Sequence, residues 1–86
     1  MPQTVLVVDD DPVMLQLMGY YLGRAGYEMI NAHNGREALE MAERDLPHLI
    51  VLDLRMPEMG GLTALRQLKE TVATEAIPVI IIARAP

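Results

Sequence analysis

Three stretches built only from aliphatic residues constrain the fold of this chain more than any other feature. Residues 5–8 (VLVV), 49–52 (LIVL) and 79–82 (VIII) each place four apolar side chains in a row. Short apolar runs without alternation are typical of strands buried on both faces, as in parallel sheets covered by helices. We therefore predict an α/β protein with a parallel sheet in its centre.

The segment after the first run has the signals of a crossover helix. Pro12 suits a first helical turn, the aspartates before it can cap that turn, and Gly26 suits the end of the helix. Apolar residues recur between these limits at helical spacing: Met14, Leu17, Met18, Tyr21 and Ala25.

Two further helices and a more polar strand complete the pattern. Residues 27–32 predict an edge strand, and Asn34 with Glu37 resembles a capping box that opens a helix to about Arg44. The inward positions of that helix are Ala38, Leu39 and Ala42, and a third helix is marked by Leu62, Leu65, Leu68 and Val72. Strands and helices thus alternate in one domain, residues 1–86. Right-handed crossovers place helices on both faces of the sheet, giving three α/β/α layers.

Composition excludes several classes of function. The chain of 86 residues has no cysteine, which excludes disulfides and thiolate metal sites, and its net charge of −5 argues against direct nucleic-acid binding. No signal peptide and no apolar run long enough to cross a membrane is present. We expect a cytoplasmic location.

Acidic residues follow two of the predicted strands. Asp9, Asp10 and Asp11 come directly after the first run, and Asp53 follows residues 49–52. Ligands of open parallel sheets bind at the carboxyl ends of the strands. Carboxylates that converge there repel one another unless a hard cation such as Mg²⁺ lies among them. An aspartate beside that cation can accept a phosphoryl group.

The stretches VLVVDDDP (5–12), LIVLDLRMP (49–57) with Gly61, and IPVI (77–80) resemble the response-regulator receiver domain of two-component signalling. The resemblance implies a flavodoxin-like sheet with strand order 2-1-3-4. It also implies a truncated receiver, because the sequence ends at Pro86, before a fifth strand and the final helices.

Carried over by position, the resemblance makes Asp53 the phosphoacceptor and Asp9 and Asp10 the acidic pair that holds Mg²⁺, with Asp10 the direct ligand. Arg55 would lend its backbone carbonyl to the metal, and Asp11 would cap the first helix. The implied partner is a sensor histidine kinase or a phosphotransfer protein that donates from a phosphohistidine. The chain would not be an enzyme beyond self-catalysed phosphorylation and dephosphorylation.

Two positions depart from the family pattern. Receivers place Ser or Thr at the end of the fourth strand, where this chain has Ala83. They also have a lysine after the fifth strand, whereas the one lysine here is Lys69, on the third predicted helix. The loss of the hydroxyl position predicts weak or absent propagation of the signal, and the truncation is expected to impair the phosphoacceptor activity. Neither His33 nor His48 belongs to a motif, so both are expected to have structural roles.

Two alternatives remain open. An inert interaction module would form a homodimer through the exposed edge of residues 79–82 or by exchange of elements. A phosphatase of the haloacid-dehalogenase type would use Asp9 as nucleophile and Asp11 as acid and base, but the lysine and later acidic pair of that family have no counterpart here.

Overall fold

The computed structural model describes residues 2–56 and 60–83. Strands and helices alternate along these residues as the aliphatic runs predict. They are β1 (Thr4–Val8), α1 (Pro12–Arg24), β2 (Glu28–Ala32), α2 (Gly35–Asp45), β3 (Leu49–Asp53), α3 (Gly61–Glu70) and β4 (Val79–Ile82). Pro57 of the acceptor motif and the last residue, Pro86, lie outside the described residues.

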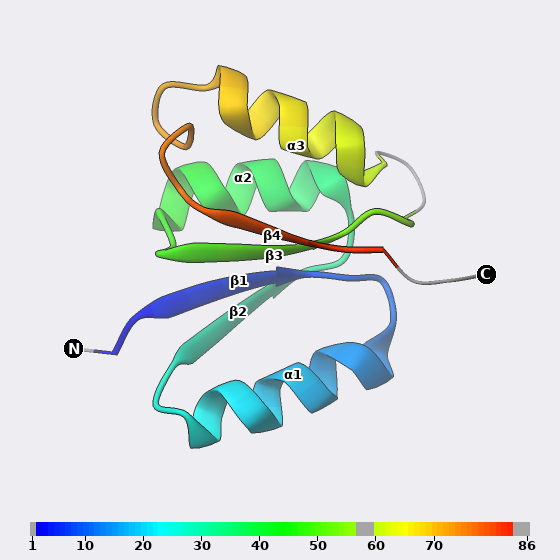
Figure 1. Cartoon of the computed structure of the whole chain (residues 1–86), viewed down its shortest axis with the longest axis vertical. Coiled ribbons are helices and arrows are strands. Elements are labelled where there is room, and N and C mark those ends of the chain that lie inside the picture. The colour runs from blue at the N-terminus through cyan, green and yellow to red at the C-terminus, as the bar shows by residue number, and fades with distance from the viewer. Residues whose placement is uncertain (1, 57–59, 84–86) are drawn as a thin grey trace.

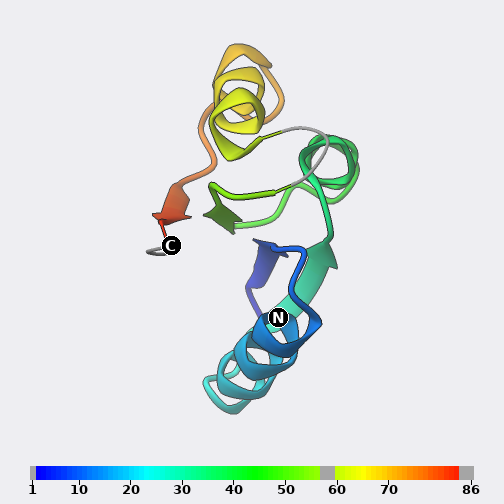
Figure 2. The ribbon, with the colours of Figure 1, turned by 90° about the vertical axis from the view of Figure 1, so that its right-hand side faces the viewer.

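The strands form one parallel sheet in the order β2-β1-β3-β4, which confirms the flavodoxin-like order. The more polar β2 lies at an edge, as predicted, and β4 is the opposite edge of the described sheet. Figures 1 and 2 show α1 on one face and α2 and α3 together on the other. The three predicted layers are therefore present.

Each face of the sheet carries its own core, because neighbouring residues of a strand point to opposite faces. The buried residues on the face of α2 and α3 are Leu6, Val8, Ala32, Ala38, Ala42, Ile50, Leu52, Ala64 and Leu68. On the face of α1 they are Val5, Val7, Leu15 and Val51. The runs 5–8 and 49–52 thus supply both cores, and this accounts for their unbroken apolar character.

The buried side of α1 differs in part from the one predicted from the sequence, and that part of the prediction was wrong. Leu15 is buried with Met18 and Leu22 packed beside it, whereas Leu17 and Tyr21 are 48% and 65% exposed. Figure 2 shows the cause: α1 lies over the β1–β2 half of the sheet and not over its middle. A helix in that place buries one narrow stripe, so its other apolar residues remain exposed.

The third helix is shorter than predicted. It ends at Glu70, and Val72 beyond it is 84% exposed. The backbone becomes extended at Thr71, and hydroxyl groups bond carbonyls of the last turn: Thr71 Oγ1 donates to the Gln67 carbonyl and the buried Thr74 Oγ1 donates to the Leu68 carbonyl, each at 2.7 Å. At the other end, Leu62 is 64% exposed, and the buried positions of the helix are Gly61, Ala64 and Leu68.

Side-chain caps fix the starts of α1 and α2. Asp11 accepts the Val13 N–H at 2.9 Å, and Asn34 accepts the Glu37 N–H at 2.9 Å. The predicted capping box is present in a shifted form, because Glu37 reaches back to the His33 N–H, one residue before the cap. The hydrogen bond from the His33 backbone N–H makes the largest contribution to lowering the pKa of Glu37, and the hydrogen bond with the His33 ring makes the second largest.

Candidate functional site

Asp53 is the last residue of β3 and is fully buried. Two neighbouring strands hold the end of β3 in place. Leu52 pairs with Val8 of β1, and Asp53 pairs with Ile82 of β4. The Leu54 N–H continues this ladder with a 3.1 Å hydrogen bond to the Ile82 carbonyl. The Asp53 side chain therefore extends from a backbone that the sheet fixes on both sides.

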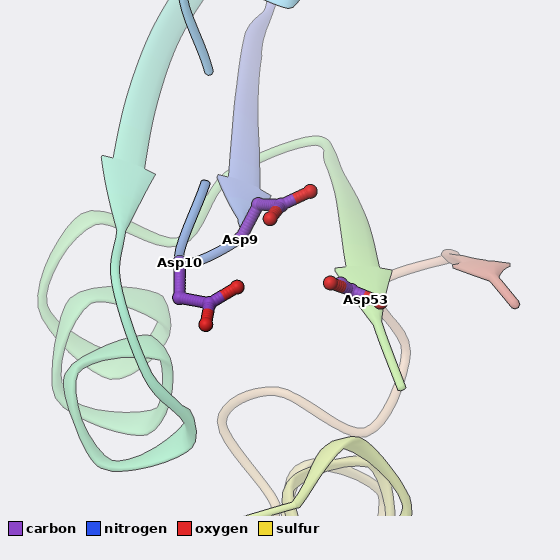
Figure 3. A group of neighbouring side chains, drawn as sticks. All are labelled: Asp9, Asp10 and Asp53. Atoms are coloured by element: carbon purple, nitrogen blue, oxygen red, sulfur yellow. The ribbon is translucent and has the colours of Figure 1, made fainter. Parts of the chain in front are cut away.

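Asp9 and Asp10 follow β1 at the same edge of the sheet. The Asp9 N–H bonds the Ala32 carbonyl of β2 at 3.1 Å, and the Asp9 side chain is 1% exposed. Its Oδ1 accepts the Asp11 N–H at 2.9 Å. Asp10 is exposed. Figure 3 shows the carboxylates of Asp9 and Asp10 turned toward Asp53.

The three carboxylates converge as the sequence analysis predicted. One oxygen from each of Asp9, Asp10 and Asp53 lies within 4.8 Å of the others. Oxygen ligands of one Mg²⁺ ion lie at most about 4.2 Å apart, since each metal–oxygen bond is about 2.1 Å. Three ligands cannot all lie opposite one another, so at least two of the three pairs would be adjacent at about 3.0 Å, and these oxygens would have to draw together by up to about 1.8 Å to bind the ion directly. Hard oxygen donors with up to three negative charges fit Mg²⁺ chemically.

Arg55 contributes a backbone amide to this site. Its N–H donates to Asp53 Oδ1 at 3.1 Å, while its side chain is exposed. The contact repeats the one between Asp9 and the Asp11 N–H, so each buried carboxylate is oriented by the amide two residues later. The sequence indicated Arg55 only through the family resemblance, as a carbonyl ligand of the metal. The contact of its N–H with Asp53 could be found only from the structure.

Other residues considered in the sequence analysis lie at or away from the cluster. Ala83 directly follows β4, one residue beyond the Ile82 partner of Asp53. Lys69 Nζ donates to the carbonyls of Glu75 and Ile77, before β4 and thus at the other end of the sheet. His48 Nδ1 accepts the Thr4 N–H at 3.0 Å, which is a structural contact.

Gly61, which the sequence indicated only as part of the family motif, makes a backbone contact that the sequence did not predict. The structure places Gly61 in the first turn of α3, directly against the backbone of Asp53 and Leu54. Its N–H donates to the Leu54 carbonyl at 3.2 Å. The spacing of eight residues from Asp53 is visible in the sequence, but the close approach across the loop is not.

Comparison with known proteins identifies the family. The family model described as the response regulator receiver domain matches residues 5–85. The chain belongs to this family. Receiver domains generally accept phosphoryl groups and are not enzymes, and they bind Mg²⁺ in an acidic site like the one formed here by Asp9, Asp10 and Asp53.

Curated relatives support the assignment. The polar-differentiation response regulator DivK of Brucella anthropi is 38% identical over 80 residues, which cover 93% of this chain and 65% of DivK. The alkaline phosphatase synthesis transcriptional regulatory protein PhoP of Bacillus subtilis is 43% identical over 70 residues, 81% of this chain and 29% of PhoP. This receiver chain thus spans less than two thirds of either relative.

Solved structures agree on the fold. The N-terminal domain of a response regulator receiver protein from Methanoculleus marisnigri superposes with a TM-score of 0.93 at 38% identity, over 98% of this chain and 68% of that one. The receiver domain of the sensor histidine kinase PA1611 from Pseudomonas aeruginosa gives 0.90 at 28% identity, over 94% and 66%. That structure has a magnesium ion coordinated in its active site cleft. No helix among the described residues of this receiver is long and apolar enough to cross a bilayer.

Proposed function

We propose that this receiver takes a phosphoryl group from the phosphohistidine of a sensor histidine kinase or phosphotransfer protein onto Asp53. The observation that carries the proposal is the convergence of the buried Asp53 carboxylate with those of Asp9 and Asp10 within 4.8 Å. We place the reaction in the cytoplasm, where kinases draw on ATP.

Each residue of the site has a distinct part in this reaction. A carboxylate oxygen of Asp53 forms the new bond to phosphorus while the bond from phosphorus to the donor imidazole nitrogen breaks. The Arg55 N–H, 3.1 Å from Asp53 Oδ1, orients the attacking carboxylate. Asp9, Asp10, Asp53 and the Arg55 carbonyl would hold Mg²⁺. The bound ion supplies positive charge that offsets the charges of the carboxylate and the phosphoryl oxygens.

Readout of phosphorylation differs from that of family members with a hydroxyl after the fourth strand. Ala83 occupies that position beside the Asp53–Ile82 pair, and its methyl group cannot donate a hydrogen bond to a phosphoryl oxygen. Lys69 is held by two carbonyls at the other end of the sheet. We therefore propose an acceptor whose conformational response to phosphorylation is weak.

The first experiment measures the intact mass of the protein after incubation with Mg²⁺ and a small-molecule phosphodonor. We expect the mass of one phosphoryl group to be added, and no addition when a chelator removes Mg²⁺. Asp53→Asn should abolish the gain, because an amide oxygen is a poor nucleophile.

Asp45→Asn is the matched control for this experiment. It makes the same chemical change at the C-terminal end of α2, where Asp45 pairs with Arg44 at 2.9 Å outside the acidic cluster. Phosphorylation of this variant should equal that of the wild type. A folded wild-type protein that gains no mass with Mg²⁺ would refute the proposed acceptor function.

A second proposal concerns the edge of β4. We infer that two copies of the chain pair through it, because β4 exposes both backbone groups and apolar side chains. The carbonyl of Pro78 accepts the Ile50 N–H of β3 and that of Ile82 accepts the N–H of Leu54, directly after β3. The alternate residues Val79 and Ile81 therefore direct their backbone groups outward. Ile80 and Ile81 are 52% and 39% exposed, and β4 carries no charge to oppose a second copy.

Sedimentation velocity over a range of concentrations tests this pairing. We expect wild-type dimers that Ile81→Pro converts to monomers, because proline removes the outward N–H while edge strands tolerate it. Ile81→Val keeps the N–H and should keep the dimer. A wild-type protein that remains monomeric at high concentration would exclude pairing through β4.

A further inference from the structure

We propose that Gly61 is a positioning residue for phosphoryl transfer to Asp53. Because it has no side chain, the first turn of α3 can rest directly on the Asp53–Leu54 backbone. That contact fixes the turn from which the Asp53 carboxylate and the Arg55 N–H extend. The inference rests on the proposed function and adds a residue that touches neither the phosphoryl group nor the metal.

The space around Gly61 carries the first step. A Cβ atom built there would lie 2.6 Å from the Asp53 carbonyl oxygen, 2.6 Å from Leu54 Cα and 3.2 Å from the Asp53 carbonyl carbon. All three are backbone atoms, which cannot rotate away as the end of a side chain can. Gly60, the preceding residue, has nothing within 4 Å of a Cβ at its position.

Hydrogen bonds show that this contact is part of a clamp. Leu54 is bonded from two sides: its N–H donates to the Ile82 carbonyl of β4 at 3.1 Å, and its carbonyl accepts the Gly61 N–H at 3.2 Å. The next amide, that of Arg55, donates to Asp53 Oδ1. Helix α3 and strand β4 therefore both hydrogen-bond Leu54, which lies between Asp53 and the Arg55 amide that orients the Asp53 carboxylate.

A side chain at Gly61 has a defined consequence. Relief of the 2.6 Å contact with Leu54 Cα requires α3 and the end of β3 to separate by at least about 0.9 Å, since carbon atoms pack at about 3.5 Å or more. Reacting groups need to be held within about 0.5 Å of their productive geometry. Gly61→Ala should therefore misplace the Asp53 carboxylate relative to Asp9 and Asp10.

The test compares Gly61→Ala with Gly60→Ala, which adds the same methyl group one residue earlier in open space. We expect Gly61→Ala to slow phosphorylation by the small-molecule donor at least about tenfold. We also expect it to raise the dissociation constant for Mg²⁺, measured by calorimetry, about tenfold. Gly60→Ala should match the wild type in both. Equal behaviour of the two variants would overturn the proposal.

Hydrogen exchange in metal-free protein separates positioning from a general loss of stability. In Gly61→Ala we expect the Arg55 and Leu54 amides to lose protection beyond any loss shared by the core amides of β1. A uniform loss would indicate a purely structural role and contradict the proposal. If the variant does not fold, hydrogen exchange of the wild type decides the question. The Leu54, Arg55 and Gly61 amides should then exchange through one opening reaction with the same free energy of opening. An Arg55 amide that opens independently of the other two would contradict the proposed clamp.

These readouts also separate this inference from the proposed function. If the wild type accepts no phosphoryl group, the acceptor function fails. The Mg²⁺ affinity and amide exchange of the two glycine variants still show whether Gly61 positions the acidic site.

Discussion

Asp53→Asn is expected to stabilise the metal-free protein, raising its free energy of unfolding by about 1–2 kcal/mol at neutral pH. Asp53 is fully buried within 4.8 Å of two further carboxylates, so its charge is both desolvated and repelled. Asparagine keeps an oxygen that can accept the Arg55 N–H. Urea unfolding in the presence of a chelator measures the change.

Mg²⁺ should reverse the order of stability between the two proteins. At a concentration one hundred times its dissociation constant, the ion should stabilise the wild type by about 2.7 kcal/mol and leave Asp53→Asn almost unaffected. The matched control is Asp45→Asn, which removes an exposed carboxylate whose pKa is lowered by its hydrogen bond to Arg44. Asp45→Asn should not stabilise the metal-free protein. An equal increase in the free energy of unfolding in Asp45→Asn and Asp53→Asn would refute the repulsion among the clustered carboxylates.

Leu68→Ala is expected to lower the free energy of unfolding by about 3 kcal/mol. Leu68 is fully buried in the core between the sheet, α2 and α3, and its truncation would leave a cavity there. Since domains of this kind have only about 5–15 kcal/mol of stability, the variant should unfold at a much lower urea concentration.

The same helix supplies the control for this prediction. Leu62 is 64% exposed, so Leu62→Ala should change the free energy of unfolding by less than about 0.5 kcal/mol. Losses of similar size at the two positions would contradict the orientation of α3 described here.

The sequence was sufficient to predict the sheet because its strands are unambiguous. Residues 5–8 and 49–52 are apolar at every position, and a sheet covered on both faces buries all of them except Leu49, which is partly buried. The helices were harder to orient. Helix α1 has apolar residues around much of its circumference, and its place over β1 and β2, which selects Leu15 instead of Leu17, is set by tertiary packing.

Local hydrogen bonds account for the predicted boundary that was wrong. Apolar spacing extended the third helix to Val72, but the backbone becomes extended at Thr71 after Glu70, and the hydroxyl groups of Thr71 and Thr74 satisfy carbonyls of the last turn. Such contacts depend on side-chain geometry that apolar spacing does not contain. Hydroxyl residues near a predicted helix end are the signal that could have shortened it.

The acidic site was predictable in its residues but not in its supports. Asp9, Asp10 and Asp53 stand at strand ends, and a parallel sheet brings those ends together. The Arg55 N–H and the Gly61 backbone contact join residues across a turn and a loop. They therefore became visible only when the path of the chain was known.

Identification of the phosphorylated residue tests the central claim most directly. Borohydride reduction of the acyl phosphate, followed by proteolysis and tandem mass spectrometry, marks the aspartate that carried the group. The acceptor function predicts the mark at Asp53 and an unmodified peptide that contains Asp9 and Asp10. A mark at Asp9 would contradict it and would instead support a nucleophile of the haloacid-dehalogenase type.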